Sequence, residues 1–299
     1  MSAEQVKPPR RQTEKRANDL EGAAWTRASI SVWSDLRKTP EETALKHPAM
    51  FPAQLVQRVI ECFTRSTDRT ILDPFSGSGS TLVTAHALDR LGIGFEVSDE
   101  YRELTRRRLE TAGATPADFQ LHAASSTRIP ELLPADSVDL CVTSPPYWDI
   151  LTRKRTADYK AVRDYAEGDE DLSHVADYSE FIERLAGVFD GVYQVLKPGR
   201  YCVINVMDLR KKAQFFPLHS DLASRLSDPS RGGRFIFDDL IVWDRRADYN
   251  NLRPLGYPAV FRINKVHEFL LIMRKPELTA AAKERVTADA RRLTPMEAD

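Results

Sequence analysis

Residues 144 to 147, Ser-Pro-Pro-Tyr, carry groups that could hold an amine in a fixed position. The run 137–142 before them has the length and β-branched content of a buried strand. Two prolines then end this strand in a stiff turn, because proline donates no backbone N–H and holds φ near one value. The Ser144 hydroxyl and the Pro145 carbonyl can accept hydrogen bonds from an exocyclic amine, and the Tyr147 ring can stack on a planar base. A Pro-Pro turn without chemistry is the competing interpretation of the tetrapeptide alone.

A glycine-rich loop earlier in the chain is the second functional motif. The short apolar run 70–72 predicts a strand, and it opens directly into residues 73–81, Asp-Pro-Phe-Ser-Gly-Ser-Gly-Ser-Thr. Residues 82–88 then have the pattern of a helix. A strand, a glycine turn and a helix in this order form the first half of a Rossmann-like nucleotide-binding unit. The glycines let the backbone approach a ligand closely, and the helix N-terminus offers free N–H groups.

An acidic residue, Glu96, lies near the end of the second predicted strand, 92–97, which is followed by a helix over 100–111. A carboxylate in this place typically accepts hydrogen bonds from ribose hydroxyls. A solvated carboxylate at a strand end is the alternative interpretation. A third strand is predicted over 119–122, and a fourth over 138–142 leads into the tetrapeptide.

The remaining apolar runs complete an α/β fold. In chain order they predict helices over 55–63, 178–196 and 218–226 and strands over 201–206, 235–243 and 268–273. Lys197-Pro198-Gly199 is the expected stop of the second of these helices. The last two strands are expected to pair as an antiparallel hairpin around a long loop. The pattern as a whole predicts a mostly parallel seven-stranded sheet with an antiparallel C-terminal hairpin.

The length of the chain allows one large domain or two small ones, and we expect one. The chain has 299 residues, of which 42% are hydrophobic and 29% charged, which allows a sizeable core and excludes wholesale disorder. We expect the domain over 21–276, a disordered basic arm over 1–20 and a polar tail over 277–299. The formal net charge is −1, so a polyanionic partner would have to be held by local basic patches.

The sequence also bears on the environment of the protein. No apolar run reaches membrane-spanning length, and the N-terminus lacks the apolar core of a signal peptide, so we expect a cytoplasmic protein without membrane contact. Cys62, Cys141 and Cys202 lie in apolar surroundings and lack the spacing of metal ligands. They are expected to be buried thiols, and no metal site is predicted.

Basic clusters in three loops are the candidate contacts to phosphate; the loops are 149–177, 208–234 and 244–262. Arg153, Lys154 and Arg155 in the first loop are the first choice, and Arg245 and Arg246 in the last are the second. For each cluster, a solvated face without a partner is an equally common outcome.

Together these residues resemble the DNA amino-methyltransferases, which methylate cytosine N4 or adenine N6 with S-adenosylmethionine. The resemblance covers about residues 45 to 275. Residues 73–79 look like the cofactor loop of that family, and 144–147 like its catalytic tetrapeptide. His47-Pro48-Ala49 with Phe51-Pro52 is similar to the segment that contacts the methionine end of the cofactor. Weaker family features are matched by residues 195–199 and by His267-Glu268, a pair for which we expect a structural role close to the site.

The resemblance implies a Rossmann-like S-adenosylmethionine-dependent methyltransferase fold and assigns the site residues. The catalytic set is Ser144, Pro145, Pro146 and Tyr147. The set that would bind S-adenosylmethionine is His47, Pro48, Phe51, Asp73, Pro74, Phe75, Ser76, Gly77, Gly79, Ser80, Thr81, Glu96 and Ser125. Trp148 would help Tyr147 to hold the target base and joins the basic clusters as a nucleic-acid contact.

The chain departs from the family pattern in three ways. In the subgroups of the family where motifs like residues 47–49 and 73–75 are commonest, the tetrapeptide usually precedes the cofactor loop. In this chain it follows the loop. The acid that often follows the third strand is replaced by residues 123–126, Ala-Ala-Ser-Ser. A separate large target-recognition domain is not visible, so the three basic loops would have to recognise the target.

The implied reaction is methylation of the exocyclic amine of a base that has left the duplex stack. Serine at the first tetrapeptide position is more often found with N4-cytosine, and the missing Pro-Cys nucleophile argues against C5 methylation. N6-adenine methylation, an RNA substrate such as a tRNA guanine amine, and a non-catalytic nucleic-acid-binding module are the alternatives. The expected partners are double-stranded DNA and a separate restriction endonuclease in another chain, with a monomer or homodimer as the assembly.

Overall fold

The computed structural model describes residues 16–44, 52–148, 172, 175–211, 213–248 and 254–277. The predictions for most of the basic arm, for most of the loop 149–177 and for nearly all of the C-terminal tail therefore lie outside the described residues.

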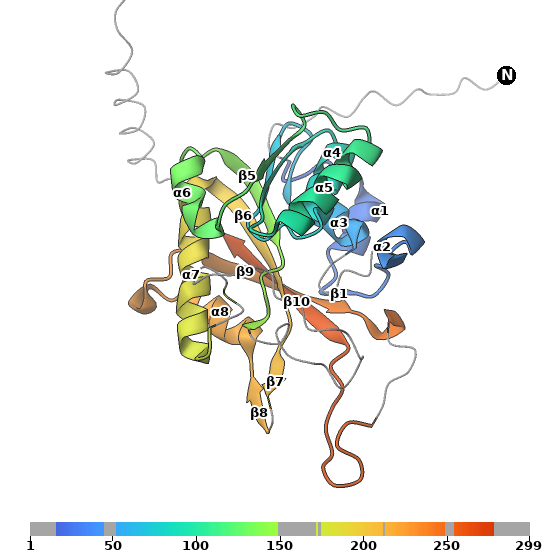
Figure 1. Ribbon diagram of the computed structural model, residues 1–299, viewed down its shortest axis with the longest axis vertical. Helices are drawn as coiled ribbons and strands as arrows, with labels where there is room; N and C mark the ends of the chain where they lie inside the picture. The colour runs from blue at the N-terminus through green and yellow to red at the C-terminus, as the bar shows by residue number, and fades with distance from the viewer. Residues whose placement is uncertain are drawn as a thin grey trace, which may run out of the picture.

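A mixed β-sheet forms the centre of the molecule (Figure 1). Its eight strands lie in the order β1-β9-β10-β6-β5-β2-β3-β4. They are β1 (Val32–Trp33), β2 (Thr70–Asp73), β3 (Leu91–Phe95), β4 (Phe119–His122), β5 (Val138–Thr143), β6 (Leu196–Val206), β9 (Ile236–Asp244) and β10 (His267–Arg274). All neighbouring pairs are parallel except those of β10, which runs antiparallel to both β6 and β9. The predicted parallel sheet with an antiparallel C-terminal pair is confirmed.

Two details of the sheet differ from the prediction. The two-residue strand β1 adds an eighth strand beyond β9, and it pairs only Val32 with Val242 and Trp33 with Trp243. β6 begins at Leu196, five residues earlier than predicted. The segment 197–199 therefore ends the helix before it and also belongs to the strand, because Leu196 pairs with Val138 and the Gly199 N–H donates to the Lys275 carbonyl.

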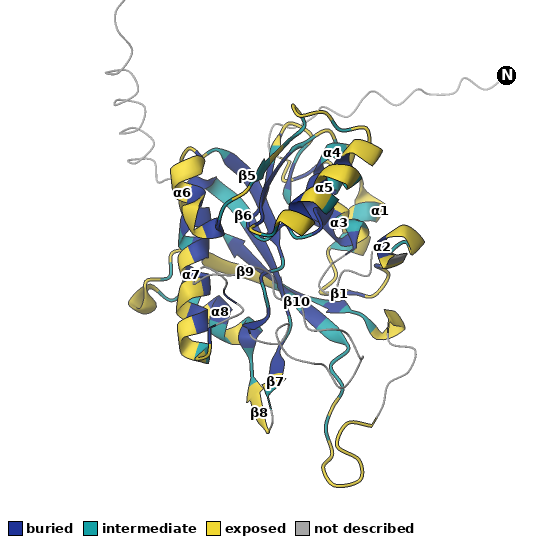
Figure 2. Cartoon of the chain, in the orientation of Figure 1, coloured by how far each residue is buried: buried dark blue, intermediate teal, exposed yellow. Residues whose placement is uncertain are grey.

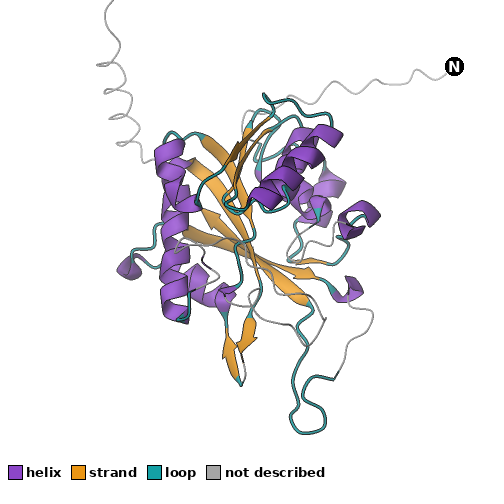
Figure 3. Ribbon diagram, in the orientation of Figure 1, coloured by secondary structure: helices purple, strands orange, loops and turns teal. Residues whose placement is uncertain are grey.

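Helices cover both faces of the sheet, with α3 to α5 on one side and α6 to α8 on the other (Figures 1 and 3). They are α1 (Gly22–Ala28), α2 (Pro40–Ala44), α3 (Ala53–Phe63), α4 (Ser80–Ala87), α5 (Asp99–Thr111), α6 (Ile129–Leu132), α7 (Tyr178–Val195) and α8 (Leu218–Ser227). The long helix α7 is capped by Asp177, whose side chain accepts a hydrogen bond from the Glu180 N–H at 2.9 Å. An acidic N-cap of this kind satisfies a backbone donor that the first turn leaves without a partner.

Two apolar cores result, one on each face of the sheet (Figure 2). Successive side chains of a strand point to opposite faces. In β5, Leu140 and Val142 accordingly join the core under α3, while Cys141 joins the core under α7. The strand is buried on both faces, so it reads as a continuous apolar run in the sequence.

The basic loop 208–234 contains more structure than the sequence predicted. The helix α8 was expected, but a short hairpin of β7 (Leu209–Lys211) and β8 (Gln214–Phe216) precedes it. This hairpin and residues 254–266 project from the body on the same side (Figure 1). They also touch, because the Lys265 ammonium lies 4.8 Å from the centre of the Phe215 ring.

The helices and the cysteines can be compared with two further expectations from the sequence. Within the described ranges, no helix is both long and apolar enough to cross a membrane. Cys141 and Cys202 are buried and Cys62 is half-buried, all as free thiols, and burial raises the pKa of Cys62 to about 11.

Candidate active site

The sheet brings the two sequence motifs together. β2 and β5 are parallel neighbours, with Leu72 opposite Cys141. The glycine loop after β2 and the tetrapeptide after β5 therefore leave the same edge of the sheet side by side. A hydrogen bond of 2.6 Å from Thr143 Oγ1 to Asp73 Oδ1 joins them across 70 positions of sequence. In an open parallel sheet, ligands bind outside the carboxyl ends of the strands.

Asp73 acts as a link between the two motifs. Its carboxylate is buried and accepts three hydrogen bonds, from the Thr143 hydroxyl, from the Thr81 hydroxyl at 2.6 Å and from the Phe75 N–H at 3.1 Å. The residue thus ties the end of β5 and the first turn of α4 to the glycine loop. Burial raises the pKa of Asp73 to about 6, although these donors favour the charged form.

Asp73 is expected to make folding stability depend on pH. Its pKa is about 6 in the folded protein against an ordinary value of 3.8, so the folded state holds the proton more tightly. The contribution of this residue is then greatest below about pH 4 and falls by about 3 kcal/mol as pH rises through 6. Asp73→Asn removes the titrating group, so its free energy of unfolding should not carry this pH dependence. Urea unfolding at pH 4.5 and 7.5 should therefore show the wild type losing stability relative to the variant as the pH rises. A difference independent of pH would contradict the account.

The glycine loop has a backbone that other residues would not easily adopt. Gly77 and Gly79 have φ values of 49° and 77°. A Cβ atom on Gly79 would lie 2.5 Å from Thr105 Cγ2, a distance that real contacts do not reach. The Thr105 hydroxyl on α5 also donates to the Gly77 carbonyl at 3.0 Å, which fixes the loop against this helix. The loop therefore requires glycine at position 79.

Glu96 lies just after β3, beside this loop, as the sequence predicted. One carboxylate oxygen accepts from the Gly77 N–H at 2.9 Å and the other from the Ser98 N–H at 2.8 Å. Burial raises the pKa of Glu96 above its ordinary value. Its role as an acceptor for ribose hydroxyls remains a prediction.

The loop has unused hydrogen-bonding capacity that suits a nucleoside cofactor. The hydroxyls of Ser76 and Ser80 are buried and have no partner within the described part of the chain. Ser80 is also the first residue of α4, where the helix leaves N–H groups unsatisfied. Two buried hydroxyls, a helix N-terminus and the neighbouring Glu96 thus fit a polar ligand with hydroxyl groups. Pro74 and Phe75 form the turn that begins this loop.

Of the other predicted cofactor residues, the structure describes Ser125. Ser125 is buried after β4, at the same sheet edge, and its hydroxyl accepts from the Thr127 N–H at 3.3 Å. His47, Pro48 and Phe51 lie outside the described residues.

Sequence reasoning missed His122, the last residue of β4. Its Nε2 is buried and lacks a partner among the described residues, and its ring stacks on Phe95 at 4.7 Å.

The tetrapeptide is anchored through Tyr147. Ser144 is half-buried, and its hydroxyl lies 3.0 Å from the Tyr147 hydroxyl. Tyr147 is 8% exposed and donates to Glu268 Oε2 at 3.0 Å, while Asn205 Nδ2 donates to the Tyr147 hydroxyl at 3.2 Å. Pro145 is buried and Pro146 half-buried between these residues. The expected structural role of Glu268 close to the site agrees with this contact, and stacking of a base on Tyr147 stays a prediction.

Trp148 does not lie at the surface. The residue is 4% exposed, and its indole N–H donates to the Val175 carbonyl at 2.7 Å. The ring packs edge-on against Phe216 at 5.0 Å, and the Lys211 ammonium lies 3.7 Å from its centre. Enclosed in this way, Trp148 is a packing residue in this conformation, and its ring is not accessible to nucleic acid.

The predicted basic contacts have acidic partners where the structure describes them. Arg245 pairs with Glu268 and donates to Asp248 at 3.1 Å. Arg246 pairs with Asp244 at 2.6 Å, and its side chain is 75% exposed. Arg153, Lys154 and Arg155 lie outside the described residues. Arg246 is thus the exposed member of the second cluster, while Arg245 belongs to the site.

This combination of fold and site defines a Rossmann-like methyltransferase. A family model for DNA methylases of the N6/N4 type matches residues 3–107 and 138–295, and the chain belongs to this family. The region that the family model leaves unmatched includes β4 and the segment where the expected acid is replaced.

Curated relatives match a shorter part of the chain. The Type II methyltransferase M2.DpnII of Streptococcus pneumoniae is 44% identical over 85 residues, which is 28% of this chain and 31% of the relative. M.ScaI of Streptomyces caespitosus, also a Type II methyltransferase, is 43% identical over 74 residues, which is 25% of this chain and 23% of the relative. The chain thus spans less than a third of the length of these relatives. Among solved structures, TrmN of Thermus thermophilus is 14% identical with a TM-score of 0.46, over 75% of this chain and 48% of TrmN.

Proposed function

We propose that this protein transfers a methyl group from S-adenosylmethionine to the exocyclic amine of a base in double-stranded DNA, with cytosine N4 as the preferred target. The observation that carries the proposal is the adjacency of the two motifs at the ends of β2 and β5, joined by the Thr143–Asp73 hydrogen bond of 2.6 Å. A ligand on the glycine loop and an amine on Ser144 would be neighbours there. Membership of the N6/N4 DNA methylase family supports DNA as the substrate.

The cofactor site in this proposal is the glycine loop. Gly77 and Gly79 let the backbone approach the ligand, Ser76 and Ser80 offer buried hydroxyls, and Glu96 accepts from the ribose. S-adenosylmethionine supplies a methyl group on a positively charged sulfur. The protein then has to bring one nitrogen to that methyl group in the correct orientation.

The tetrapeptide would provide this orientation. An exocyclic amine is a poor nucleophile because its lone pair is delocalised into the ring. If the Ser144 hydroxyl and the Pro145 carbonyl accept its two hydrogens, a more tetrahedral nitrogen is favoured, whose lone pair points out of the ring plane. This is catalysis by positioning and electrostatics, without a covalent intermediate between protein and base.

The preference for cytosine rests on serine at position 144. In the family that the chain resembles, Asp or Asn at this position more often accompanies adenine, and Ser more often accompanies N4-cytosine. One hydrogen-bonding residue discriminates only partly between two amines. N6-adenine is therefore the second candidate. The base would have to leave the duplex stack to reach Ser144.

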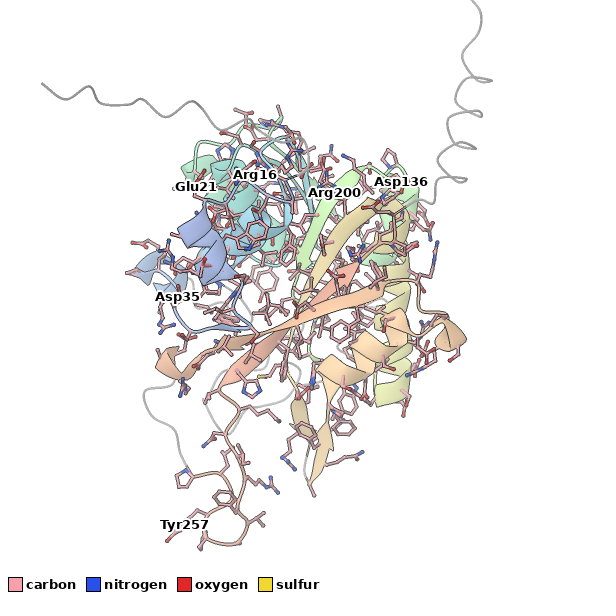
Figure 4. The ribbon with its side chains drawn as sticks, turned by 180° about the vertical axis from the view of Figure 1, so that it is seen from behind. Arg16, Glu21, Asp35, Asp136, Arg200 and Tyr257 are labelled. Carbon is pink, nitrogen blue, oxygen red and sulfur yellow. The ribbon has the colours of Figure 1, made fainter. Side chains whose placement is uncertain are left out.

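DNA would be held by the two projecting segments, β7–β8 and residues 254–266, which we call the two-pronged surface. Cations alternate with aromatic rings on it: Arg210 lies 5.5 Å and Lys265 4.8 Å from the ring centre of Phe215. Phe215 is 43% and Phe261 93% exposed. Tyr257 lies at the tip of the longer segment (Figure 4). Such a surface suits phosphates and exposed base faces. It overlaps the predicted target loops 208–234 and 244–262, and Lys265 lies beyond the second of them.

Removal of charge from the two-pronged surface should weaken DNA binding and its salt dependence. Arg210→Gln and Lys265→Gln are each expected to reduce the slope of log affinity against log salt by about 1, because each removes one phosphate contact. Arg107→Gln on α5, whose side chain is 65% exposed, is the matched control and should change nothing. Fluorescence anisotropy with labelled duplex at several salt concentrations measures the slopes. Wild-type slopes in both variants would remove the two-pronged surface from the account.

The proposed function is tested by incubating the protein with methyl-labelled S-adenosylmethionine and either duplex DNA or RNA of the same sequence. Label is expected in the DNA. Label confined to RNA would overturn the choice of substrate, and S-adenosylmethionine binding without transfer to any nucleic acid would favour a non-catalytic binding module. The Type II relatives further suggest a separate restriction endonuclease of the same sequence specificity as the partner of the enzyme.

A further inference from the structure

Three buried side chains and the half-buried Arg245 form a polar cluster next to the tetrapeptide. Tyr147 follows β5, Asn205 lies on β6 and Glu268 on β10, three strands that are neighbours in the sheet. Asn205 is 3% and Glu268 4% exposed, and Arg245 pairs with Glu268 from the end of β9. We call these residues the Tyr147 cluster. Among the hydrogen bonds of the described residues, the one between the Tyr147 and Ser144 hydroxyls joins this cluster to Ser144.

The direction of each hydrogen bond in the Tyr147 cluster follows from chemistry. A carboxylate accepts and never donates, so Glu268 must receive hydrogens from Tyr147, Asn205 and Arg245. The side-chain amide of Asn205 is thereby oriented, because the opposite orientation would bring its oxygen against the carboxylate. In this orientation Asn205 Nδ2 also donates to the Tyr147 hydroxyl.

The Tyr147 hydroxyl has one hydrogen, and it donates this hydrogen in the hydrogen bond to Glu268. Burial and the neighbouring carboxylate hold the pKa of Tyr147 well above its ordinary value, so this hydrogen stays in place. Tyr147 can then only accept from the Ser144 hydroxyl at 3.0 Å, its remaining hydrogen-bonding neighbour among the described residues. Ser144 therefore donates its single hydrogen to Tyr147. Its oxygen lone pairs remain available for an incoming amine.

We propose that Glu268 is a positioning residue for methyl transfer, which acts through Tyr147 to make the Ser144 hydroxyl an acceptor toward the substrate amine. The inference rests on the proposed function. It adds that the Glu268 carboxylate sets the direction of the hydrogen bonds from Ser144 to Tyr147 and from Tyr147 to Glu268. Without this direction, Ser144 could present its own hydrogen to the amine. Two donors would then face each other, and the amine would be held poorly.

Glu268→Gln tests the direction with almost no change in shape. The Arg245 guanidinium attracts the amide oxygen of the new side chain, so its NH₂ group faces Tyr147. Asn205 also donates to the oxygen of Glu268 that faces Tyr147, so its amide has to turn over in the variant. Tyr147 then accepts from position 268, and its own hydrogen is free to point at Ser144, which allows the chain to reverse. We expect kcat to fall about 100-fold while KM for DNA changes less than about twofold. Glu183→Gln on α7, which removes the charge that pairs with Arg225, is the matched control and should leave kcat unchanged.

A double-mutant cycle separates this role from a merely structural one. Tyr147→Phe breaks the connection between position 268 and Ser144, at a moderate loss of kcat. In that background, Glu268→Gln is expected to change kcat by less than about twofold, because no hydroxyl is left to transmit the reversal. Equal losses from Glu268→Gln in both backgrounds, or wild-type kcat in the single variant, would overturn the proposal. If the wild type methylates RNA instead of DNA, the proposed function fails, and the same cycle on RNA still tests Glu268.

Discussion

Ser144→Ala is expected to lower kcat about 100- to 1000-fold, the usual cost of removing one preorganised hydrogen-bonding group from a reacting centre. The variant keeps the Pro145 carbonyl, so it loses one of the two acceptors for the amine. Ser144 is half-buried at the end of a stiff turn, and alanine fits there without a clash. The affinity for S-adenosylmethionine should stay at the wild-type value, since no contact of the glycine loop is changed. Single-turnover transfer and calorimetric titration of the cofactor measure the two quantities.

A matched control lies at the opposite end of the same strand. Ser137 precedes β5, and its hydroxyl donates to the Pro134 carbonyl at 2.7 Å. Ser137→Ala removes the same atom from the edge of the sheet away from the site, so it should leave kcat unchanged. Undiminished turnover in the Ser144 variant would end the role of this residue as an amine acceptor.

Gly77→Leu should weaken cofactor binding about 100-fold or more, a loss of about 3 kcal/mol. The backbone of Gly77 is fixed on both sides, because its N–H donates to Glu96 and its carbonyl accepts from Thr105. The loop therefore cannot move away to make room for a side chain. A leucine would fill the space through which the ligand has to approach the backbone.

The control for Gly77→Leu has to match its backbone strain. Gly113, after α5, has a φ of 82°, and a Cβ atom there would meet nothing within 4 Å. Gly113→Leu thus carries the cost of a side chain at positive φ without entering a ligand site. It should lose some stability and bind S-adenosylmethionine like the wild type. Retained affinity in the Gly77 variant would contradict the assignment of the loop.

Much of the fold could be predicted because its strands are buried on both faces. Such strands give apolar runs that end at glycine or proline, and residues 70–73 and 138–143 are examples. Their order in the sheet is the usual one for a Rossmann-like unit, which puts β2 and β5 side by side. β1 escaped prediction because two residues carry no periodicity, and the β7–β8 hairpin because its strands have only three residues each.

The parts of the site that sequence reasoning missed depend on contacts between distant segments. Asn205 reaches Tyr147 across 58 positions, and no local pattern marks this pair. Glu268 was expected close to the site from the family resemblance, but its contact with Tyr147 across 121 positions has no local signal either. Arg245 was assigned to DNA because it is basic, whereas the fold brings it to Glu268. Trp148 was assigned to the target base because it follows the tetrapeptide, whereas β8 and the segment before α7 enclose it.

The identity of the methylated nucleoside tests the central claim most directly. Duplex DNA treated with the wild-type protein and methyl-labelled S-adenosylmethionine would be digested to nucleosides and analysed by mass spectrometry. The account predicts N4-methylcytosine, formed about 100- to 1000-fold more slowly when Ser144→Ala replaces the wild type. N6-methyladenine would contradict the preference for cytosine, and a methyl group on a ring carbon would contradict amine transfer by the Ser-Pro-Pro-Tyr turn altogether.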